Sequence, residues 1–257
     1  MKINQIAAQL FTLRDYIKTP ADIAVTLKKV RQLGYQAVQV SGMGPIEEAE
    51  LNRMLEGEGL TCCATHEDPN KILNETALVI ERLQKLNCRF TAYPFPAGVD
   101  FSTLPNVLEL AAKLDAAGKR MRKAGQVLTY HNHAIELQPV EGKTALAWIY
   151  EKTRRQNLQG EIDTNWIQNG GGDPVAWCKK LKRRLPLLHL KDYTIRNNAP
   201  AFAPIGQGNL NMPAIIKAAD AAGCEWFIVE QDNCYGGDPF EALGTSFRFL
   251  ETLAQAT

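Results

Sequence analysis

Residues 187–192 read Leu-Leu-His-Leu-Lys-Asp. In a β-strand, successive side chains point to opposite faces, so His189 and Lys191 share one direction and Leu188 and Leu190 share the other. Leucines that pack outward against helices, opposite polar groups near the strand end, are typical of a β/α barrel. The segment therefore predicts a barrel strand that carries functional side chains at its C-terminal end.

Seven further short runs are rich in β-branched or aromatic residues and are bounded by turn residues. They cover residues 3–10, 35–40, 61–65, 89–93, 126–131, 160–163 and 226–230. Helix-like patterns of about 10 to 20 residues separate the runs. No Gly-rich phosphate-binding motif follows the first predicted strand. Strict alternation of eight strands with helices predicts one α/β domain over residues 1–257, a (β/α)₈ TIM barrel rather than an open doubly wound sheet.

The charge balance limits the classes of partner. Lys and Arg total 29 and Asp and Glu total 28, giving a net charge of +1. Such a chain has no strong field for nucleic acid or for an anionic membrane, so a small, weakly charged substrate fits better. The N-terminal residues show no signal-peptide pattern and no apolar run approaches the length of a membrane span, which predicts a cytoplasmic protein.

The histidines indicate a metal site. All four lie within or just beyond the C-terminal ends of predicted strands, and two acids end two further strands. These residues are His66, His131, His133, His189, Asp163 and Glu230. The C-terminal ends of the strands meet on one face of a barrel, where imidazoles and carboxylates together can hold a divalent ion.

The fifth predicted strand offers two alternative metal ligands. His131 and His133 would point the same way if the strand continued past residue 131, with Asn132 turned outward. Either histidine could bind the ion; we favour His131, because it ends the strand proper. Glu136 follows three residues after His133 and is a further candidate at this corner.

Other strand ends supply the remaining candidates. Asp163 is interpreted as a ligand rather than a helix cap, because the glycine run 170–172 handles the turn and Asp173 caps the next helix. Glu230 ends an apolar strand and should point inward. His66 is placed at the rim, in contact with substrate, and Trp166 forms a pocket wall.

The ligand set His131, Asp163, His189 and Glu230 joins two imidazoles to two carboxylates. This mixed set suits one Mn²⁺, Co²⁺, Fe²⁺, Zn²⁺ or Mg²⁺ ion. An ion held in this way would polarise a substrate carbonyl and ease removal of the adjacent proton. Lys191 could orient a hydroxyl or stabilise the developing negative charge.

At these residues the chain resembles the xylose isomerase-like sugar isomerase/epimerase family, which includes inosose dehydratases and tagatose-type epimerases. The resemblance covers almost the whole chain and is carried by Tyr-His-Asn-His-x-x-Glu at 130–136, the 163–166 segment and the Gly-Gly-Gly-Asp-Pro run at 170–174. It implies four ligands, usually Glu, Asp, His and Glu, from strands five to eight. Asp163, His189 and Glu230 match the last three.

Three positions depart from that family pattern. The first ligand position falls on the segment 131–133, which has no glutamate, so Glu136 is the candidate for the missing carboxylate. Gln39 and Gln207 stand where relatives often have glutamate. Each change removes a negative charge near the barrel mouth.

The leading hypothesis is a metal-dependent isomerase or epimerase of a sugar or polyol. The catalytic candidates are Glu230 as the base, Lys191 and Glu136; the substrate-binding candidates are His66, His133, Trp166 and Gln231. A lyase or dehydratase acting on keto-sugars or keto-inositols is the alternative, with His66 or Lys191 as the acid. A non-catalytic sugar-binding barrel and an endonuclease rank lower, and a homo-oligomer is compatible with the resemblance.

Overall fold

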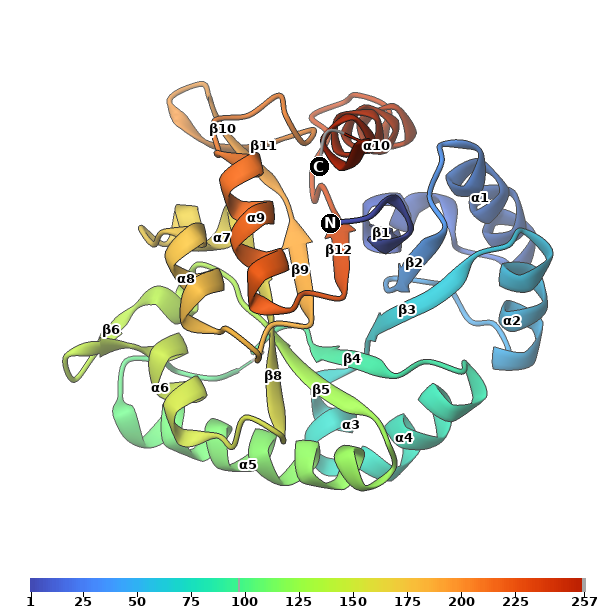
Figure 1. The fold of residues 1–257 in the computed structure, drawn as a ribbon. Helices are drawn as coiled ribbons and strands as arrows, with labels where there is room; N and C mark the ends of the chain where they lie inside the picture. Colours follow the sequence, from blue (N-terminus) through green and yellow to red (C-terminus); the bar gives the residue numbers. More distant parts are fainter. Residues whose placement is uncertain (97, 256–257) are drawn as a thin grey trace.

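The computed structural model describes residues 1–96 and 98–255 of the chain. Eight parallel strands close into a barrel in the order β1-β12-β9-β8-β5-β4-β3-β2 (Figure 1). They are β1 (Ile6–Gln9), β2 (Ala37–Val40), β3 (Thr61–His66), β4 (Phe90–Tyr93), β5 (Val127–His131), β8 (Leu158–Asp163), β9 (Leu187–Leu190) and β12 (Trp226–Val229). The predicted single-domain (β/α)₈ barrel is confirmed.

Helices surround the barrel and connect consecutive strands (Figure 1). They are α1 (Pro20–Gln32), α2 (Glu48–Gly57), α3 (Pro69–Asn74), α4 (Thr76–Lys85), α5 (Leu104–Lys123), α6 (Ala145–Lys152), α7 (Thr164–Asn169), α8 (Pro174–Lys180), α9 (Met212–Ala222) and α10 (Pro239–Gln255). Thr19 caps α1 by accepting a hydrogen bond from Asp22 N, and Asp173 caps α8, each before a proline at the first helical position. Among the described residues, no helix is both long and apolar enough to cross a membrane.

Two short hairpins interrupt the alternation of strands and helices. They are β6 (Pro139–Val140) with β7 (Lys143–Thr144), and β10 (Asp192–Arg196) with β11 (Ala199–Ala203). The expectation that only helical segments lie between the barrel strands was therefore wrong at these two places. The second hairpin follows β9 directly and extends the loop above the barrel mouth.

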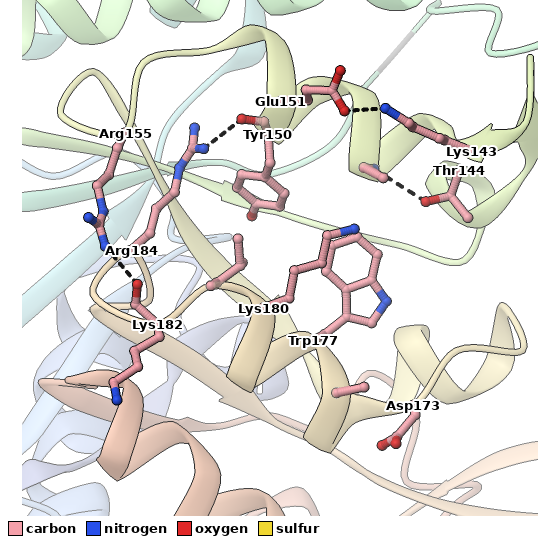
Figure 2. Close-up of a pocket in the computed structure, with 13 residues that line it drawn as sticks. Lys143, Thr144, Tyr150, Glu151, Arg155, Asp173, Trp177, Lys180, Lys182 and Arg184 are labelled. Carbon is pink, nitrogen blue, oxygen red and sulfur yellow. Dashed lines mark hydrogen bonds and ion pairs between the residues drawn. The ribbon is translucent and has the colours of Figure 1, made fainter.

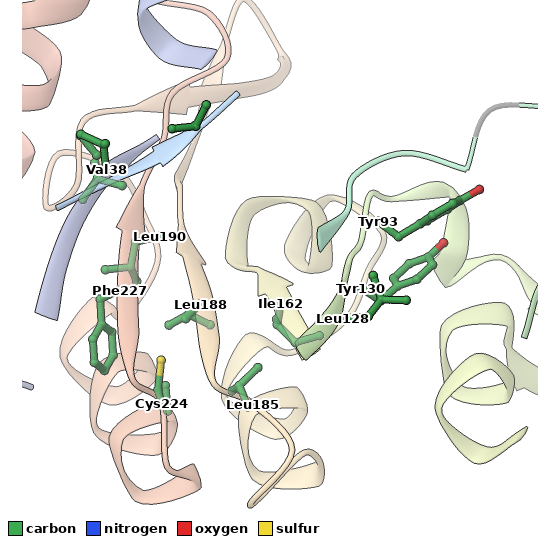
Figure 3. Packing of buried hydrophobic residues seen from close by; sticks show 14 of the residues in the cluster. Val38, Tyr93, Leu128, Tyr130, Ile162, Leu185, Leu188, Leu190, Cys224 and Phe227 are labelled. Carbon is green, nitrogen blue, oxygen red and sulfur yellow. The ribbon is translucent and has the colours of Figure 1, made fainter. Parts of the chain in front are cut away.

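Apolar packing has an outer and an inner part. The outer part lies between strands and helices and includes Leu188, Leu190 and Phe227 (Figure 3). The inner part fills the barrel with a smaller cluster that includes Ala7, Leu187 and Ile228. Because each strand alternates, the residues two positions beyond this inner cluster point to the same interior. The polar residues of the mouth therefore lie directly above this apolar interior.

Asp192 organises the loop that follows β11. Its buried carboxylate accepts hydrogen bonds from the main-chain N–H groups of Tyr193, Gly206, Gly208 and Leu210 at 2.9 to 3.2 Å. This carboxylate replaces water as the acceptor for one N–H group of β10 and three N–H groups of the loop. It therefore fixes the backbone of residues 204–210 against β10.

Asp192→Ala is expected to lower the free energy of unfolding by about 2–4 kcal/mol, because main-chain donors lose their only shared acceptor. Urea denaturation followed by circular dichroism measures the change. Asp100→Ala is the matched control: Asp100 also accepts main-chain and side-chain bonds, from Ser102, but it lies on the surface and should change stability little. Equal stability losses in the two variants would contradict this role for Asp192.

Candidate active site

A cavity of about 400 Å³ opens at the C-terminal ends of the barrel strands. Polar residues from four strand ends line it together with apolar residues such as Phe11 and Phe95. The polar ones include His66, His131, His133, Lys191, Glu230 and Asp232. The structure thus brings together side chains that lie up to 221 positions apart in the sequence, from Phe11 to Asp232.

A larger cavity, about 730 Å³, lies outside the barrel between α6 and α8 (Figure 2). Tyr150, Trp177, Lys180 and Arg184 line it. Arg184 donates hydrogen bonds to the main-chain oxygens of Leu158, Tyr150 and Thr153, and the Lys180 ammonium lies over the Trp177 ring. Its titratable groups are thus engaged in structural contacts, whereas those of the barrel mouth converge on one another, so the chemistry is assigned to the mouth.

Glu161 is the centre of the polar cluster. It is fully buried on β8, and its Oε1 lies 2.6 Å from His66 Nε2 and 2.9 Å from His189 Nε2. Its Oε2 accepts a hydrogen bond from Gln39 Nε2 at 3.0 Å. Burial opposes ionisation, but the charges of His189 and His66 outweigh it and lower the pKa of Glu161 to about 2.

Asp163, two residues further along β8, uses its two oxygens differently. Oδ1 accepts a hydrogen bond from Trp166 N at 2.9 Å and so caps α7. The argument that Asp163 is no helix cap was therefore wrong: a short helix follows β8 directly, before the glycine run. Oδ2 forms no hydrogen bond among the described residues and lies 3.0 Å from Lys191 Nζ. Burial raises the pKa of Asp163 to about 6.

Lys191 carries a buried ammonium group that is surrounded by three carboxylates. Its Nζ lies 3.0 Å from Asp163 Oδ2, 2.7 Å from Glu230 Oε2 and 2.8 Å from Asp232 Oδ2. Although burial opposes ionisation of Glu230, this ammonium lowers the pKa of Glu230 below its ordinary value. Glu230 is therefore an anion at neutral pH in direct contact with an internal cation.

His189 lies between the two glutamates. Its Nδ1 is 3.0 Å from Glu230 Oε2, and its Nε2 is 2.9 Å from Glu161 Oε1 and 2.5 Å from Gln39 Oε1. Burial lowers the basicity of the ring, but the two carboxylates outweigh it and raise the pKa of His189 to about 10. Both ring nitrogens of His189 therefore face carboxylates, one on each side of the ring.

The two histidines of the fifth unit have different surroundings. His131 ends β5, is 3% exposed, and its Nδ1 forms no hydrogen bond among the described residues. His133 lies in the loop beyond β5, where its ring packs against Phe95 and Trp166. Burial lowers the pKa of His133 to about 3. His133 therefore forms part of the cavity wall as a neutral ring, and His131 lies closer to the carboxylates.

Two other candidates are held elsewhere. Glu136 is fully buried; it accepts hydrogen bonds from Tyr130 Oη at 3.0 Å and from His133 N at 2.8 Å, and burial raises its pKa to about 7. Gln231 donates to the main-chain oxygen of Asn233. Neither side chain lines the cavity. Glu136 shapes the loop that carries His133, so the structure does not bring it to the position of a missing catalytic carboxylate.

Asn132 and Trp166 complete the surroundings of β8. Asn132 is completely buried, and its Oδ1 accepts a hydrogen bond from Asp163 N, which links the end of β5 to the end of β8. The Trp166 ring lies 5.5 Å from that of His133 and 5.8 Å from Lys191 Nζ. It therefore stands beside the charged cluster, but it is not among the residues that line the cavity, so its role as a pocket wall stays a prediction.

Two overlapping groups of donors in this cluster could hold a metal ion. One is His131, Asp163, His189 and Glu230, and the other is His66, His131, Glu161 and His189. In each group the ligand atoms lie within 4.8 Å of one another. The donors fit an ion, since His131 Nδ1 and Asp163 Oδ2 are buried and lack hydrogen bonds within the described part of the chain.

The charge of the cluster also favours a cation. Glu161, Asp163, Glu230 and Asp232 are four carboxyl groups, and Lys191 is the lysine in direct contact with three of them. Burying four carboxyl groups with one ammonium and the His189 imidazolium leaves uncompensated negative charge, which is costly in a medium of low dielectric constant. A divalent ion would compensate two of these charges.

Glu161 was not among the sequence candidates, although the sequence contained a signal for it. Glu161 and Asp163 are separated by one apolar residue, so on a strand they face the same side. Gln39 was noted only as a departure from the family pattern, yet it bonds both Glu161 and Gln9. Both residues sit one layer deeper than the strand ends, where the predicted ligands lie.

Similar proteins share this architecture. The chain is 23% identical over 258 residues to the rhizopine catabolism protein MocC of Rhizobium meliloti, covering 84% of this chain and 75% of that protein. It superimposes on a sugar phosphate isomerase/epimerase from Parabacteroides distasonis ATCC 8503 with a TM-score of 0.83, at 22% identity, covering 95% and 96% of the two chains. A xylose isomerase-like TIM barrel protein from Mycobacterium smegmatis, solved in complex with magnesium, gives a TM-score of 0.76 at 15% identity, covering 100% and 99%.

At these identities the solved structures establish the fold alone. The family assignment rests on the sequence profile described as xylose isomerase-like TIM barrel, which matches residues 27–253. That match begins within α1 and ends within α10, so it includes every barrel strand except β1. It also includes all the histidines and carboxylates of the polar cluster, whereas Gln9 on β1 lies outside it. The chain therefore belongs to the xylose isomerase-like TIM barrel family.

Proposed function

We propose that this protein is a metal-dependent sugar or polyol isomerase that moves a proton next to a substrate carbonyl. One observation carries the proposal: two imidazoles, His131 and His189, meet several buried carboxylates and the Lys191 ammonium beside one 400 Å³ cavity. A divalent ion bound by His131, His189 and neighbouring carboxylates would act as a Lewis acid toward the carbonyl. The likeness to a sugar phosphate isomerase/epimerase supports the same reaction class.

Glu230 is the proposed base. It is ionised, lines the cavity and lies on the last strand, where a substrate carbon can approach it. Lys191 is 2.7 Å from the Glu230 carboxylate and also lines the cavity, so its ammonium can donate to a substrate oxygen that gains negative charge. His133 and Trp166 would contact the rest of the substrate through their rings.

The number of acid–base groups on each face separates the reaction types. An isomerase that transfers a proton between neighbouring carbons can use one base on one face of the substrate, whereas inversion of a carbon requires a second group on the opposite face. Glu230 and Asp232 come from the same strand end, and β5 contributes His131 rather than a carboxylate. One-base isomerisation therefore fits the geometry best, and an epimerase would need His66 as its second group.

A lyase is the second candidate, because His66 lines the same cavity as Glu230. Its Nε2 hydrogen-bonds Glu161 at 2.6 Å, an arrangement in which a histidine can carry and release a proton. A β-hydroxyl or glycosyl group protonated by His66 could then leave after Glu230 removes the neighbouring proton. Elimination and isomerisation would share the first proton transfer.

Incubation of the Mn²⁺-loaded protein with ketoses and keto-inositols in deuterated water tests the proposal. Proton NMR should show exchange of the C–H proton next to the carbonyl and formation of the isomeric sugar. Glu230→Gln should reduce the exchange rate by about 10²–10⁴-fold, the usual contribution of a general base. Glu151→Gln, a change on the outer surface of α6, is the control and should exchange at the wild-type rate.

The products distinguish the alternatives. Exchange that accompanies an unsaturated product would replace isomerase with lyase. Tight sugar binding with no exchange in the metal-loaded wild type would leave only a binding protein. Unaltered exchange in Glu230→Gln would exclude Glu230 as the base.

A further inference from the structure

The cavity of about 730 Å³ between α6 and α8 takes no part in the proposed reaction. Helix α5 packs against α6, and α8 packs against α9, so the cavity opens between two packed helix pairs of the layer around the barrel. We propose that this cavity binds a small phosphorylated molecule that carries a flat ring, such as a nucleotide. The inference is independent of the barrel-mouth chemistry, because the two cavities share no lining residue.

One end of this cavity is basic. Arg155, Lys182 and Arg184 lie there (Figure 2). The two carboxylates of the lining, Glu151 and Asp173, lie away from that end (Figure 2). Glu151 is paired with the lysine of β7, and Asp173 caps α8. Neither carboxylate therefore compensates the cations of the basic end.

The cations of the basic end have neutral partners. Arg155 donates to the main-chain oxygen of Lys182 at 2.7 Å, and Arg184 donates to main-chain oxygens as described above. Within residues 1–96 and 98–255, none of these three side chains forms an ion pair. Asp115, whose charge acts on Arg184, accepts hydrogen bonds from two groups of the loop before β8 instead. Burial lowers the pKa of Arg184, and the neighbouring charge of Arg155 adds to this effect. An anion at this end would therefore compensate positive charge that the chain leaves unpaired.

Several unpaired cations favour a phosphate over a carboxylate. A phosphate monoester carries a charge of about −1.5 to −2 at pH 7 and three acceptor oxygens, and a guanidinium can bind two of these oxygens at once. Arg155 uses one of its five N–H groups for the oxygen of Lys182, which leaves donors for a phosphate. Both side chains are exposed, so they can turn toward a ligand without leaving a buried position.

The middle of the cavity is apolar and aromatic. The rings of Tyr150 and Trp177 have centroids 6.3 Å apart and planes inclined by 51°. Inclined rings form an apolar wedge, which a flat ring can enter with edge or face contacts. The Lys180 ammonium lies 4.5 Å from the Trp177 centroid, and such a contact is weak for an exposed cation, so a ligand ring can take its place. The ammonium is then available to the phosphate. The other apolar lining residues are Ala147, Ala176 and Leu181. A volume of about 730 Å³ lies within the range of small-molecule sites.

Calorimetric titration of the metal-free protein with adenosine 5′-monophosphate tests the proposal. One molecule should bind per chain. Adenosine, which lacks the phosphate, and ribose 5-phosphate, which lacks the ring, should each bind at least about tenfold more weakly. Arg155→Gln should weaken binding of the nucleotide by at least about tenfold, because a charge-assisted contact is lost. Arg154→Gln is the matched control: it removes the same charge from the neighbouring exposed position, which does not line the cavity, and should bind within about twofold of the wild type.

Fluorine NMR locates the ligand. The chain has only four tryptophans, so protein labelled with 5-fluorotryptophan gives a simple spectrum. The nucleotide should shift the resonance of Trp177, which Trp177→Phe identifies by its loss, and should leave that of Trp166 beside the barrel mouth unchanged. A spectrum in which Trp166 shifts and Trp177 does not would place the ligand at the mouth and overturn the proposal.

Three other results would contradict the inference. Absence of saturable binding of the nucleotide to the wild type would exclude the site. Equal losses in Arg154→Gln and Arg155→Gln would show a general attraction between charges instead of a site. Ribose 5-phosphate that binds as strongly as the nucleotide would exclude the contact with a flat ring. Circular dichroism of each variant establishes that lost binding is not a lost fold.

Discussion

His189→Ala is expected to abolish metal binding and to lower kcat/KM by about 10³-fold or more, because Lewis-acid stabilisation contributes several kcal/mol to the transition state. His189 belongs to both donor sets and contacts both Glu161 and Glu230. The result is therefore independent of which set holds the ion. Metal analysis after dialysis and steady-state kinetics with the substrate identified by proton exchange measure the two effects.

His133→Ala is the matched control for this experiment. His133 lies beside the same cavity but belongs to neither donor set, and its ring packs against Phe95 and Trp166. The variant should retain the ion and raise KM more than it lowers kcat, as expected for loss of a wall. Full metal occupancy in His189→Ala would contradict the site as described.

The barrel itself could be predicted from the sequence, because its signals are local. Strand composition, alternation and helix caps located all eight strands to within about three residues, since each depends on neighbours in the chain. β9 is an example. It spans Leu187–Leu190 as predicted, with Leu188 and Leu190 in the outer core and His189 inside. The hairpin of β10 and β11 was missed because it carries no apolar alternation of its own.

The centre of the site could be predicted only in part, because it depends on depth within the barrel. The positions of Asp163, His189 and Glu230 at predicted strand ends indicated that they belong to the site, and the structure places all three in one cluster. Sequence spacing does not show which side chain lies one layer below the strand ends and still reaches the site, so Glu161 was not predicted. Nor does it show that an ammonium group stands among the carboxylates, since Lys191 follows β9 and its partner Asp232 follows the neighbouring strand β12, 41 positions later in the chain.

Lys191→Met is expected to lower the unfolding free energy of the metal-free protein by about 3–5 kcal/mol, the usual cost of leaving buried charges without their partner. Methionine keeps much of the length and apolar volume of the lysine stem but removes the ammonium. Asp163, Glu230 and Asp232 then face one another with no cation between them. Thermal and urea unfolding in the presence of a chelator measure the loss. Lys180→Met, which removes an ammonium stacked over Trp177 on the outer surface, should have little effect.

The same variant should change how strongly the protein responds to a divalent ion. Without the ammonium, the carboxylates of Asp163, Glu230 and Asp232 keep their negative charge but have no lysine beside them. Mn²⁺ should therefore stabilise Lys191→Met more than it stabilises the wild type, as measured by thermal unfolding with and without the ion. Activity should nevertheless stay low, because the ammonium that would donate a hydrogen bond to the substrate oxygen is absent. If Lys191→Met were as stable as the wild type without metal and gained no more from Mn²⁺, Lys191 would not be the cation that compensates these carboxylates.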